Sequence, residues 1–212
     1  MNRIARASCR HAWCVAAITL SIVFGTPQCP AAEKRDDWQQ PDRVVADLNL
    51  GSGAVVADVG AGRGYFTFRL AAAVGEKGKV FATDIDTKAM TAVKEQAEKQ
   101  NARNVETVVS EPTDTKLAPA SVDVALLCDV LHHVPEAQRP GLVQNIAQAI
   151  KPGGFFFIVD WRDKPEVPFD RGRHIPLENL LKQATDAGLV LDAEVHYLKH
   201  QVFLRFRKPP QP

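Results

Sequence analysis

The sequence predicts a single α/β domain built on a doubly wound, mostly parallel sheet. Apolar runs rich in β-branched residues alternate with helical patterns along the chain, which is the order typical of βαβ units. The clearest unit begins with the apolar run at 54–59, passes through a turn with glycines at alternate positions, and enters a helical pattern at Tyr65. With 212 residues, 45% of them hydrophobic, the chain can bury one complete α/β core.

The remaining elements follow the same alternation. A first helix opens around Trp38 with Pro41 at a tolerated first-turn position, and Gly51 and Gly53 end it. Asp86 is expected to cap the helix that follows it. After the first strand, further strands are expected at 79–84, 104–109, 121–127, 155–160, 189–196 and 201–207, and helices at 65–75, 87–100, 135–150 and 176–187.

The turn after the first strand is the strongest indication of a ligand site. Gly60, Gly62 and Gly64 place no Cβ in the way, so a ligand can lie almost on the backbone. The free N–H groups of the next helix point back into the turn. Strand, glycine turn and helix together predict a nucleotide pocket, with an ordinary glycine-rich βα turn as the alternative.

The glycine spacing bears on which nucleotide is bound. A dinucleotide fingerprint requires G-x-G-x-x-G, but Tyr65 stands at its third glycine position counted from Gly60, and Thr67 counted from Gly62. The phosphate-loop string G-x-x-x-x-G-K-[ST] does not occur. A nicotinamide-dependent oxidoreductase is therefore disfavoured, although it stays an alternative.

The string Asp58-x-Gly60-x-Gly62-x-Gly64 resembles the first motif of the class I S-adenosylmethionine-dependent methyltransferases. The paired histidines 132–133 after the fourth strand and Lys151-Pro152-Gly153-Gly154 before the fifth are similar to features of its small-molecule, type 11 and quinone-biosynthesis branch. The resemblance covers roughly residues 38–208. It implies a Rossmann-like sheet of seven strands in the order 3-2-1-4-5-7-6, with an antiparallel last strand.

The resemblance implies S-adenosylmethionine as the cofactor, which needs a carboxylate near its amino group and another for its ribose. Asp84 ends the second strand, where a carboxylate can accept hydrogen bonds from both ribose hydroxyls; Asp86 is the competing candidate. Glu111 stands where the family commonly carries Asp against the adenine amino group. The predicted cofactor-binding residues lie in the turn and at strand ends: Asp58, Gly60, Ala61, Gly62, Gly64, Tyr65, Asp84, Ile85, Glu111, Pro112 and Asp129.

The polar residues after the fourth strand are the catalytic candidates. The run Cys128-Asp129-Val-Leu-His132-His133 emerges at the same sheet edge as Gly60 and Asp84, because carboxyl ends of parallel strands meet there. Asp129 and His132 are expected to face the pocket, whereas His133 has a hydrogen-bonded structural role as its alternative. A general base is needed only for an acceptor that arrives protonated. No metal site is predicted.

The expected reaction is methyl transfer to an unidentified small-molecule acceptor. Its pocket is expected to form from the first helix, the fourth-strand tip and the loop 161–175. The loop residues that could touch substrate are Trp161, Asp163, Arg171, Arg173 and His174. Arsenite is disfavoured because the predicted mature chain holds a single cysteine, Cys128. Nucleic acid is not an expected partner, since 26 basic residues balance 25 acidic ones without a basic block.

Residues 1–32 have the layout of a secretory signal peptide. Arg3, Arg6 and Arg10 precede the apolar stretch 12–24, and small residues lead to a cleavage site after Ala31 or Ala32. The methyltransferase domain would then occupy 33–208, followed by a tail at 209–212. No apolar run is long enough to span a bilayer as a helix in the mature chain.

Export would separate the protein from its expected cofactor, because S-adenosylmethionine is made in the cytosol. Two alternatives therefore stay open: a mis-assigned start with a cytoplasmic enzyme, or a secreted non-catalytic binding protein on the same fold. Nothing in the sequence specifies the oligomeric state.

Overall fold

The structure is a computed structural model that describes residues 35–162 and 174–210. The described residues belong to one compact unit, Glu33–Pro212. The predicted signal peptide and loop residues Asp163, Arg171 and Arg173 lie outside the described residues.

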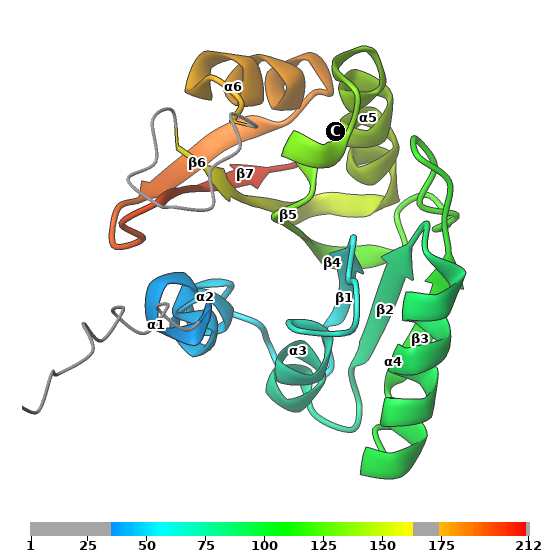
Figure 1. Cartoon of the computed structure of the whole chain (residues 1–212). Coiled ribbons are helices and arrows are strands. Elements are labelled where there is room, and N and C mark those ends of the chain that lie inside the picture. The colour runs from blue at the N-terminus through cyan, green and yellow to red at the C-terminus, as the bar shows by residue number, and fades with distance from the viewer. Residues whose placement is uncertain (1–34, 163–173, 211–212) are drawn as a thin grey trace, which may run out of the picture. The chain divides into compact units, whose positions relative to one another are not determined.

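The unit is built on a seven-stranded sheet in the order β3-β2-β1-β4-β5-β7-β6 (Figure 1). Strands β1 to β5 pair in parallel, and β7 is antiparallel to both β5 and β6. The predicted strand order and the antiparallel last strand are confirmed. The strands are β1 (Val55–Val59), β2 (Lys79–Asp84), β3 (Val105–Val109), β4 (Val122–Cys128), β5 (Ile150–Trp161), β6 (Val190–Val195) and β7 (Gln201–Arg207).

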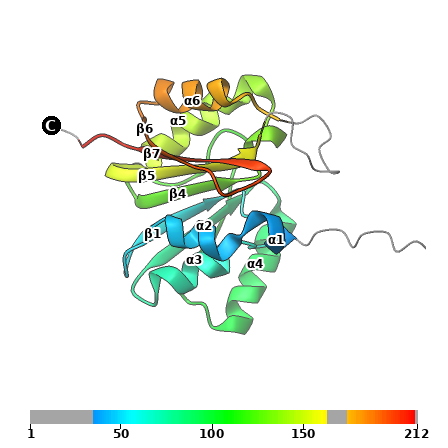
Figure 2. The same cartoon turned by 90° about the vertical axis from the view of Figure 1, so that its left-hand side faces the viewer.

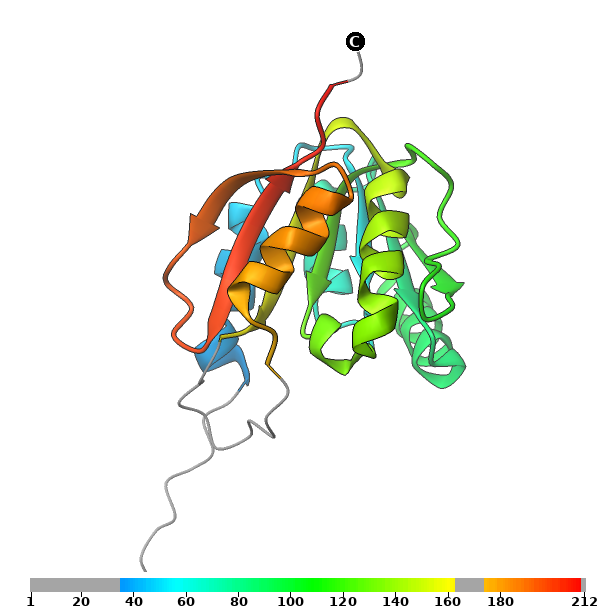
Figure 3. The same ribbon diagram turned by 90° about the horizontal axis from the view of Figure 1, so that it is seen from above.

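Helices cover both faces of this sheet, as a doubly wound fold requires (Figures 2 and 3). One face carries α1 (Arg35–Gln39), α2 (Pro41–Asp47), α3 (Thr67–Val74) and α4 (Thr87–Gln100), and the other carries α5 (Arg139–Ala149) and α6 (Leu177–Asp186). Two short 3-10 helices, η1 (Leu131–His133) and η2 (Glu136–Gln138), join β4 to α5.

Alternating side chains of the central strands supply two separate cores. In β5, Phe156 packs in the core that includes residues of α5 and α6, while Phe157 packs in the core that includes residues of α2 and α3. Both rings are buried. Because both faces of the sheet are covered, the central strands read as continuous apolar runs, which is why they are recognisable in the sequence.

Several predicted boundaries are confirmed and others are wrong for identifiable reasons. Strand β2 and helix α4 have the predicted limits, and the Asp86 side chain caps α4 by accepting from the Lys88 amide at 2.8 Å. Helix α5 begins at Arg139 instead of 135, because Pro140 fits only the first turn of a helix. The first helix is divided into α1 and α2 at Gln40, whose φ of 47° is left-handed.

Two further corrections concern the glycine-containing segments. Helix α3 begins at Thr67, since the chain from Gly62 to Phe66 is a turn. The predicted turn at 151–154 is part of β5, where the Lys208 amide donates to the Gly154 carbonyl at 2.9 Å, beyond the end of β7. Within the described ranges, no helix has the length and apolar character to cross a membrane.

Candidate active site

The glycine turn is fastened to the neighbouring strands by its backbone. The amides of Gly60 and Ala61 both donate to the Thr83 carbonyl of β2, at 2.8 and 3.0 Å. Gly60 has a φ of 71°, and a Cβ there would lie 2.3 Å from the Val130 side chain that follows β4. Glycine is therefore required at this position by conformation and by close approach.

The carboxylate of Asp84 joins the glycine turn to the start of α4. Its Oδ2 accepts from the Gly62 amide at 2.8 Å, and its Oδ1 accepts from the Asp86 amide at 2.9 Å. A carboxylate has lone pairs for further hydrogen bonds, so these two contacts fix its orientation without filling its capacity. A Cβ on Gly62 would meet nothing within 4 Å, so the turn is open beside this carboxylate.

A cavity of about 420 Å³ lies at the carboxyl ends of the parallel strands. It lies where open α/β sheets bind their ligands. Its Glu111 carboxylate also pairs with Lys116 at 2.7 Å. The lining residues come from strand ends, η1 and the start of α5: Val59, Gly60, Asp84, Ile85, Ser110, Glu111, Pro112, Asp129, Val130, His133, Val134, Pro135, Gln138 and Leu142.

Asp129 lies at the end of β4, in a left-handed conformation with a φ of 58°. Its Oδ2 accepts from the Arg35 guanidinium at 2.9 Å, and its Oδ1 accepts from the Gln201 amide. Burial raises the pKa of Asp129 to about 6, and the Arg35 charge opposes this rise. This carboxylate therefore takes up a proton more readily than an exposed one.

Helix α1 is connected to Asp129 by a closed ring of four side chains. Gln39, which is fully buried, donates to Gln201 at 2.7 Å and to the Cys128 sulfur at 3.1 Å. Arg35 Nε donates to Gln39 Oε1 at 3.0 Å, and Arg35 and Gln201 both bind Asp129. Every charged member of the ring has a partner, as a buried polar cluster requires.

Tyr65 connects the glycine turn to α1. Its hydroxyl donates to Asp36 at 2.5 Å, and the Arg35 guanidinium lies 3.8 Å above its ring. Burial and the Asp36 carboxylate raise the pKa of Tyr65 above its usual range. The turn, α1 and the β4 tip therefore meet around Arg35.

His132 is paired with a carboxylate at the end of β5. Its Nδ1 lies 2.6 Å from Asp160 Oδ1, and its backbone amide donates to Asp160 Oδ2 at 3.2 Å. The amide of Trp161 also donates to this carboxylate, at 2.8 Å. Asp160 is 1% exposed, so an Nδ1–H of His132 is the donor that this buried acceptor selects.

Comparison with known proteins finds similarity to methyltransferases. Residues 56–154 match the family described as a methyltransferase domain. The fold is similar to that of a SAM-dependent methyltransferase from Aquifex aeolicus, with a TM-score of 0.75, 24% identity, and coverage of 82% of this chain and 92% of that one. Residues 56–154 therefore match a methyltransferase domain, and the fold is similar to that of a SAM-dependent methyltransferase of known structure.

Curated relatives match over part of their length. An arsenite methyltransferase of Halobacterium salinarum is 31% identical over 54% of this chain and 32% of its own. A demethylmenaquinone methyltransferase of Bacillus mycoides is 24% identical over 66% of this chain and 57% of its own. The chain thus spans about one third of the length of the first relative and just over half of the length of the second.

The structure brings six of the predicted cofactor-binding residues to the cavity: Gly60, Asp84, Ile85, Glu111, Pro112 and Asp129. The others in the methyltransferase motif lie in or behind the turn: Asp58, Ala61, Gly62, Gly64 and Tyr65. Asp58 is 3% exposed and accepts from the Thr67 hydroxyl at 2.6 Å. Burial raises its pKa to about 6.

The structure places the two adjacent histidines in different surroundings. His133 lines the cavity, whereas His132 lies outside it with its side chain 6% exposed. The Asp160 carboxylate, a buried acceptor at the end of β5, contacts the His132 ring at Nδ1. His132 instead lies near Trp161, with ring centroids 6.4 Å apart, and Trp161 in turn lies 5.2 Å from Trp38.

Four residues of this arrangement are not predicted as site residues from the sequence: Arg35, Gln39, Asp160 and Gln201. Asp160 had a usable signal, since it is an acid at the carboxyl end of an apolar strand, like Asp84. The other three lie outside any motif. Among the residues that the structure describes, no three His, Cys, Asp or Glu side chains are grouped closely enough to hold a metal ion.

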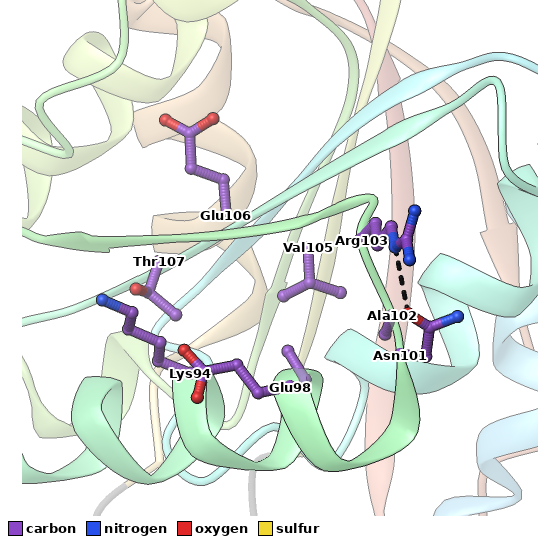
Figure 4. Close-up of a pocket in the computed structure, with 9 residues that line it drawn as sticks. Lys94, Glu98, Asn101, Ala102, Arg103, Val105, Glu106 and Thr107 are labelled. Atoms are coloured by element: carbon purple, nitrogen blue, oxygen red, sulfur yellow. Dashed lines mark hydrogen bonds between the residues drawn. The ribbon is translucent and has the colours of Figure 1, made fainter.

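A second hollow of about 580 Å³ lies between α4 and the edge strand β3 (Figure 4). Lys94 and Glu98 reach into it from α4, while Val105 and Thr107 come from β3. It lies toward the amino end of β3, and the glycine turn lies at the opposite end of the sheet. Its lining contributes no group to the site described above.

Proposed function

We propose that this protein transfers a methyl group from S-adenosylmethionine to a small-molecule acceptor. The observation that carries the proposal is the carboxylate of Asp84, fixed by two backbone amides at the rim of a cavity that adjoins the glycine turn. A nucleoside with two free ribose hydroxyls needs such an acceptor. The cavity volume of about 420 Å³ falls within the range of small-molecule sites.

Different residues of this chain would bind different parts of the cofactor. Asp84 would accept from the ribose, and the backbone from Gly60 to Gly64 would lie along the thioether. Ile85, Glu111 and Pro112 would surround the adenine at the far end of the cavity. Asp129 would face the amino-acid end, with Asp58 as a buried charge behind the turn.

The cofactor supplies a methyl group activated on a sulfonium sulfur. The contribution of the protein is to position the acceptor and to stabilise charge. Asp160 holds Nδ1 of His132, which leaves Nε2 as the atom to take a proton from an acceptor that arrives protonated. Asp129 and His132 are therefore the proposed catalytic residues, with Asp160 as a positioning residue.

The acceptor is proposed to be a planar organic molecule. Trp38 and Trp161 form a pair of aromatic rings close to His132, and aromatic surfaces favour planar ligands. One relative is named for arsenite methylation, but the described part of this chain holds one cysteine, Cys128, which is buried and accepts from Gln39. The relative named for demethylmenaquinone methylation is the better guide to the acceptor class.

Calorimetry tests the proposal directly. The chain should bind S-adenosylmethionine and S-adenosylhomocysteine, and it should not bind NAD. Transfer of labelled methyl groups to a panel of hydroquinones and phenols, with arsenite included, then identifies the acceptor. Binding of NAD alone would replace the proposal with an oxidoreductase. Tight cofactor binding with no transfer to any acceptor would favour a non-catalytic binding protein.

We also propose that the protein is exported, with a mature chain beginning at Ala32 or Glu33. The support is the charged start, apolar stretch and small-residue exit of the first 32 residues. N-terminal sequencing of the protein recovered from its native cell measures this directly. An intact Met1 in a soluble cytosolic fraction would contradict export and remove the difficulty of cofactor supply.

A further inference from the structure

We propose that the methyl acceptor carries a carboxylate and that Arg162 binds this group. The inference rests on the proposed function, and it narrows the acceptor from planar molecules in general to planar organic acids. It gives a specificity-determining role to the residue that directly follows β5, which belongs to no motif of the sequence.

Arg162 lies at the sheet edge that carries the candidate site. Strand β5 runs parallel to β4, so the end of β5 lies beside the β4 tip. Arg162 follows Asp160, which contacts His132, and Trp161, whose ring lies 6.4 Å from the ring of His132. In succession, the end of β5 therefore supplies an acid that orients the proposed base, an aromatic ring and a cation.

Arg162 is a half-buried cation whose side chain has no partner in the part of the chain that the structure describes. Its Nε is buried and meets no hydrogen-bond acceptor. The preceding acid, Asp160, is already occupied, because it accepts from the His132 ring and from the amides of His132 and Trp161. A buried polar group without a hydrogen bond costs free energy, and a charged one costs more. A bound anion would supply the missing partner.

A second polar side chain without a partner lies opposite Arg162. The Arg162 amide donates to the His200 carbonyl at 3.1 Å, which continues the antiparallel pairing of β5 with β7 by one residue pair. Residues directly opposite each other in such a pairing have neighbouring side chains on one face of the sheet. His200 is 3% exposed, and its Nδ1 has no hydrogen-bond partner among the described residues. An Nδ1–H there would donate to the second oxygen of a carboxylate that binds Arg162.

The spacing along β5 suits an aromatic hydroxy acid. Alternate residues of an antiparallel strand share a face and lie about 6.8 Å apart, which is the separation expected between Asp160 and Arg162. A benzene ring with a hydroxyl and a carboxylate at opposite positions spans a comparable length. Its hydroxyl would face His132, which Asp160 orients, while its carboxylate meets the flat guanidinium fork, whose geometry matches a carboxylate.

The reaction balances with this arrangement. The hydroxyl oxygen forms a bond to the methyl carbon as the bond from that carbon to the sulfonium sulfur breaks, with the bonding pair left on sulfur. The hydroxyl proton passes to Nε2 of His132. The carboxylate of the acceptor is unchanged, so Arg162 contributes binding and orientation.

The experiment compares two ligands that differ in charge but have nearly the same shape. Para-hydroxybenzoate carries the carboxylate, and para-hydroxybenzamide has a neutral amide in its place. Each is titrated calorimetrically into the full chain saturated with S-adenosylhomocysteine, at neutral pH. The parent should bind the acid at least about tenfold more tightly than the amide, which is equivalent to about 1.4 kcal/mol.

Arg162→Gln should remove this preference, because glutamine keeps hydrogen-bond donors and loses the charge. The affinity of this variant for the amide should stay within about twofold of the parent value. Arg162→Lys should retain part of the preference, since lysine keeps the charge and loses the fork. Arg43→Ala is the matched control, because the Arg43 guanidinium lies 3.7 Å above the ring of Tyr197 instead, and it should leave the preference intact.

Three results would overturn the inference: no preference for the acid in the parent, a preference that survives in Arg162→Gln, or equal weakening of both ligands by that variant. If the parent binds S-adenosylhomocysteine but neither aromatic ligand, the inference is overturned as well. If Arg162→Gln fails to fold, Arg162→Lys decides, since an undiminished preference there has the same consequence. Failure of the parent to bind S-adenosylhomocysteine would instead contradict the proposed function.

Discussion

Asp84 ends β2 and Asp129 follows β4, so both carboxylates lie at the same edge of the sheet. Their hydrogen-bond donors nevertheless come from different kinds of group. Asp84 is fixed by the backbone amides of Gly62 and Asp86, both of which belong to the turn and helix adjoining its strand. Asp129 is held by side chains of Arg35 and Gln201, which lie 94 and 72 residues away in the sequence. One carboxylate depends on local backbone geometry, and the other depends on the packing of distant elements.

This difference separates the two halves of the site. Backbone donors are present wherever the strands, turn and helix form, so the proposed nucleoside half depends on groups that lie close together in the sequence. Side-chain donors exist only if α1 and β7 close on the β4 tip. The half that would hold the amino-acid end and the acceptor is therefore the more sensitive to substitution, pH and the position of α1.

The largest effect is expected at His132, which follows β4. His132→Ala should lower the single-turnover rate about a hundredfold, because proton transfer by a positioned side chain contributes at least that much. The affinity for S-adenosylhomocysteine should stay nearly unchanged, since His132 lies outside the cavity. Rapid-quench kinetics with the acceptor found in the panel measures the rate.

Asp160→Asn is the companion variant for His132. Its amide retains the shape of the side chain and weakens the hold on Nδ1, so the rate should fall in the same direction. Lower cofactor affinity with an unchanged rate would place His132 in the cofactor shell. Loss of folding in His132→Ala would assign it a structural role.

The next largest effect is expected at Asp84, which is held by backbone amides of adjoining segments. Asp84→Ala should weaken S-adenosylhomocysteine at least about tenfold, since a hydrogen bond to a charged group contributes about 1.5–3 kcal/mol and about 1.4 kcal/mol is a factor of ten. It also releases the Gly62 amide that orients the turn. Asp84→Asn should be intermediate, because an amide can accept one bond without its charge. Calorimetric titration compares the three proteins.

A smaller effect should follow from the protonation of Asp129. An acid whose pKa is raised to about 6 is charged above that pH and neutral below it, so its hold on an ammonium weakens as the solution is acidified. Affinity for S-adenosylhomocysteine should fall about fourfold between about pH 7.5 and 5.5, given the ionised fraction that this pKa leaves. Isothermal titration across this range measures the slope.

A control variant distinguishes Asp129 from Asp58 as the cause of the pH-dependent affinity. Asp58 also has a pKa of about 6, so Asp129→Asn must flatten the slope if Asp129 is responsible. An unchanged slope in Asp129→Asn would assign the effect to Asp58. Stability should show the opposite sign. The folded chain binds more protons than the unfolded chain between about pH 4 and 6, so these two carboxyls make it less stable as pH rises through that window.

The smallest effect is expected at Asp86. Removing the cap of α4 with Asp86→Ala should cost about 1 kcal/mol of unfolding free energy, measured by denaturant titration. Cofactor affinity should stay within about twofold, since the contact to Asp84 uses the Asp86 backbone amide. Tight binding by Asp84→Ala together with weak binding by Asp86→Ala would show that the ribose acid is misassigned.

Elements whose physical cause is local could be predicted from the amino-acid sequence. Strand β2, helix α4 and its Asp86 cap were predictable because propensity and capping act over a few residues. The glycine turn was predictable because it joins a strand to a helix that follows it directly in the chain, and Asp84 because it ends the next strand. The order of the strands came with the family resemblance, since pairing partners far apart in a chain leave no mark on local spacing.

The contacts between polar groups from distant parts of the chain depend on tertiary packing and could not be predicted. The pairing of Asp160 with His132 fixes that histidine at the end of β5, while His133 lines the cavity. The ring through Arg35, Gln39 and Gln201 joins residues with no motif of their own. Hydrogen bonds between distant side chains depend on packing distances of a few ångströms, which composition and periodicity do not encode.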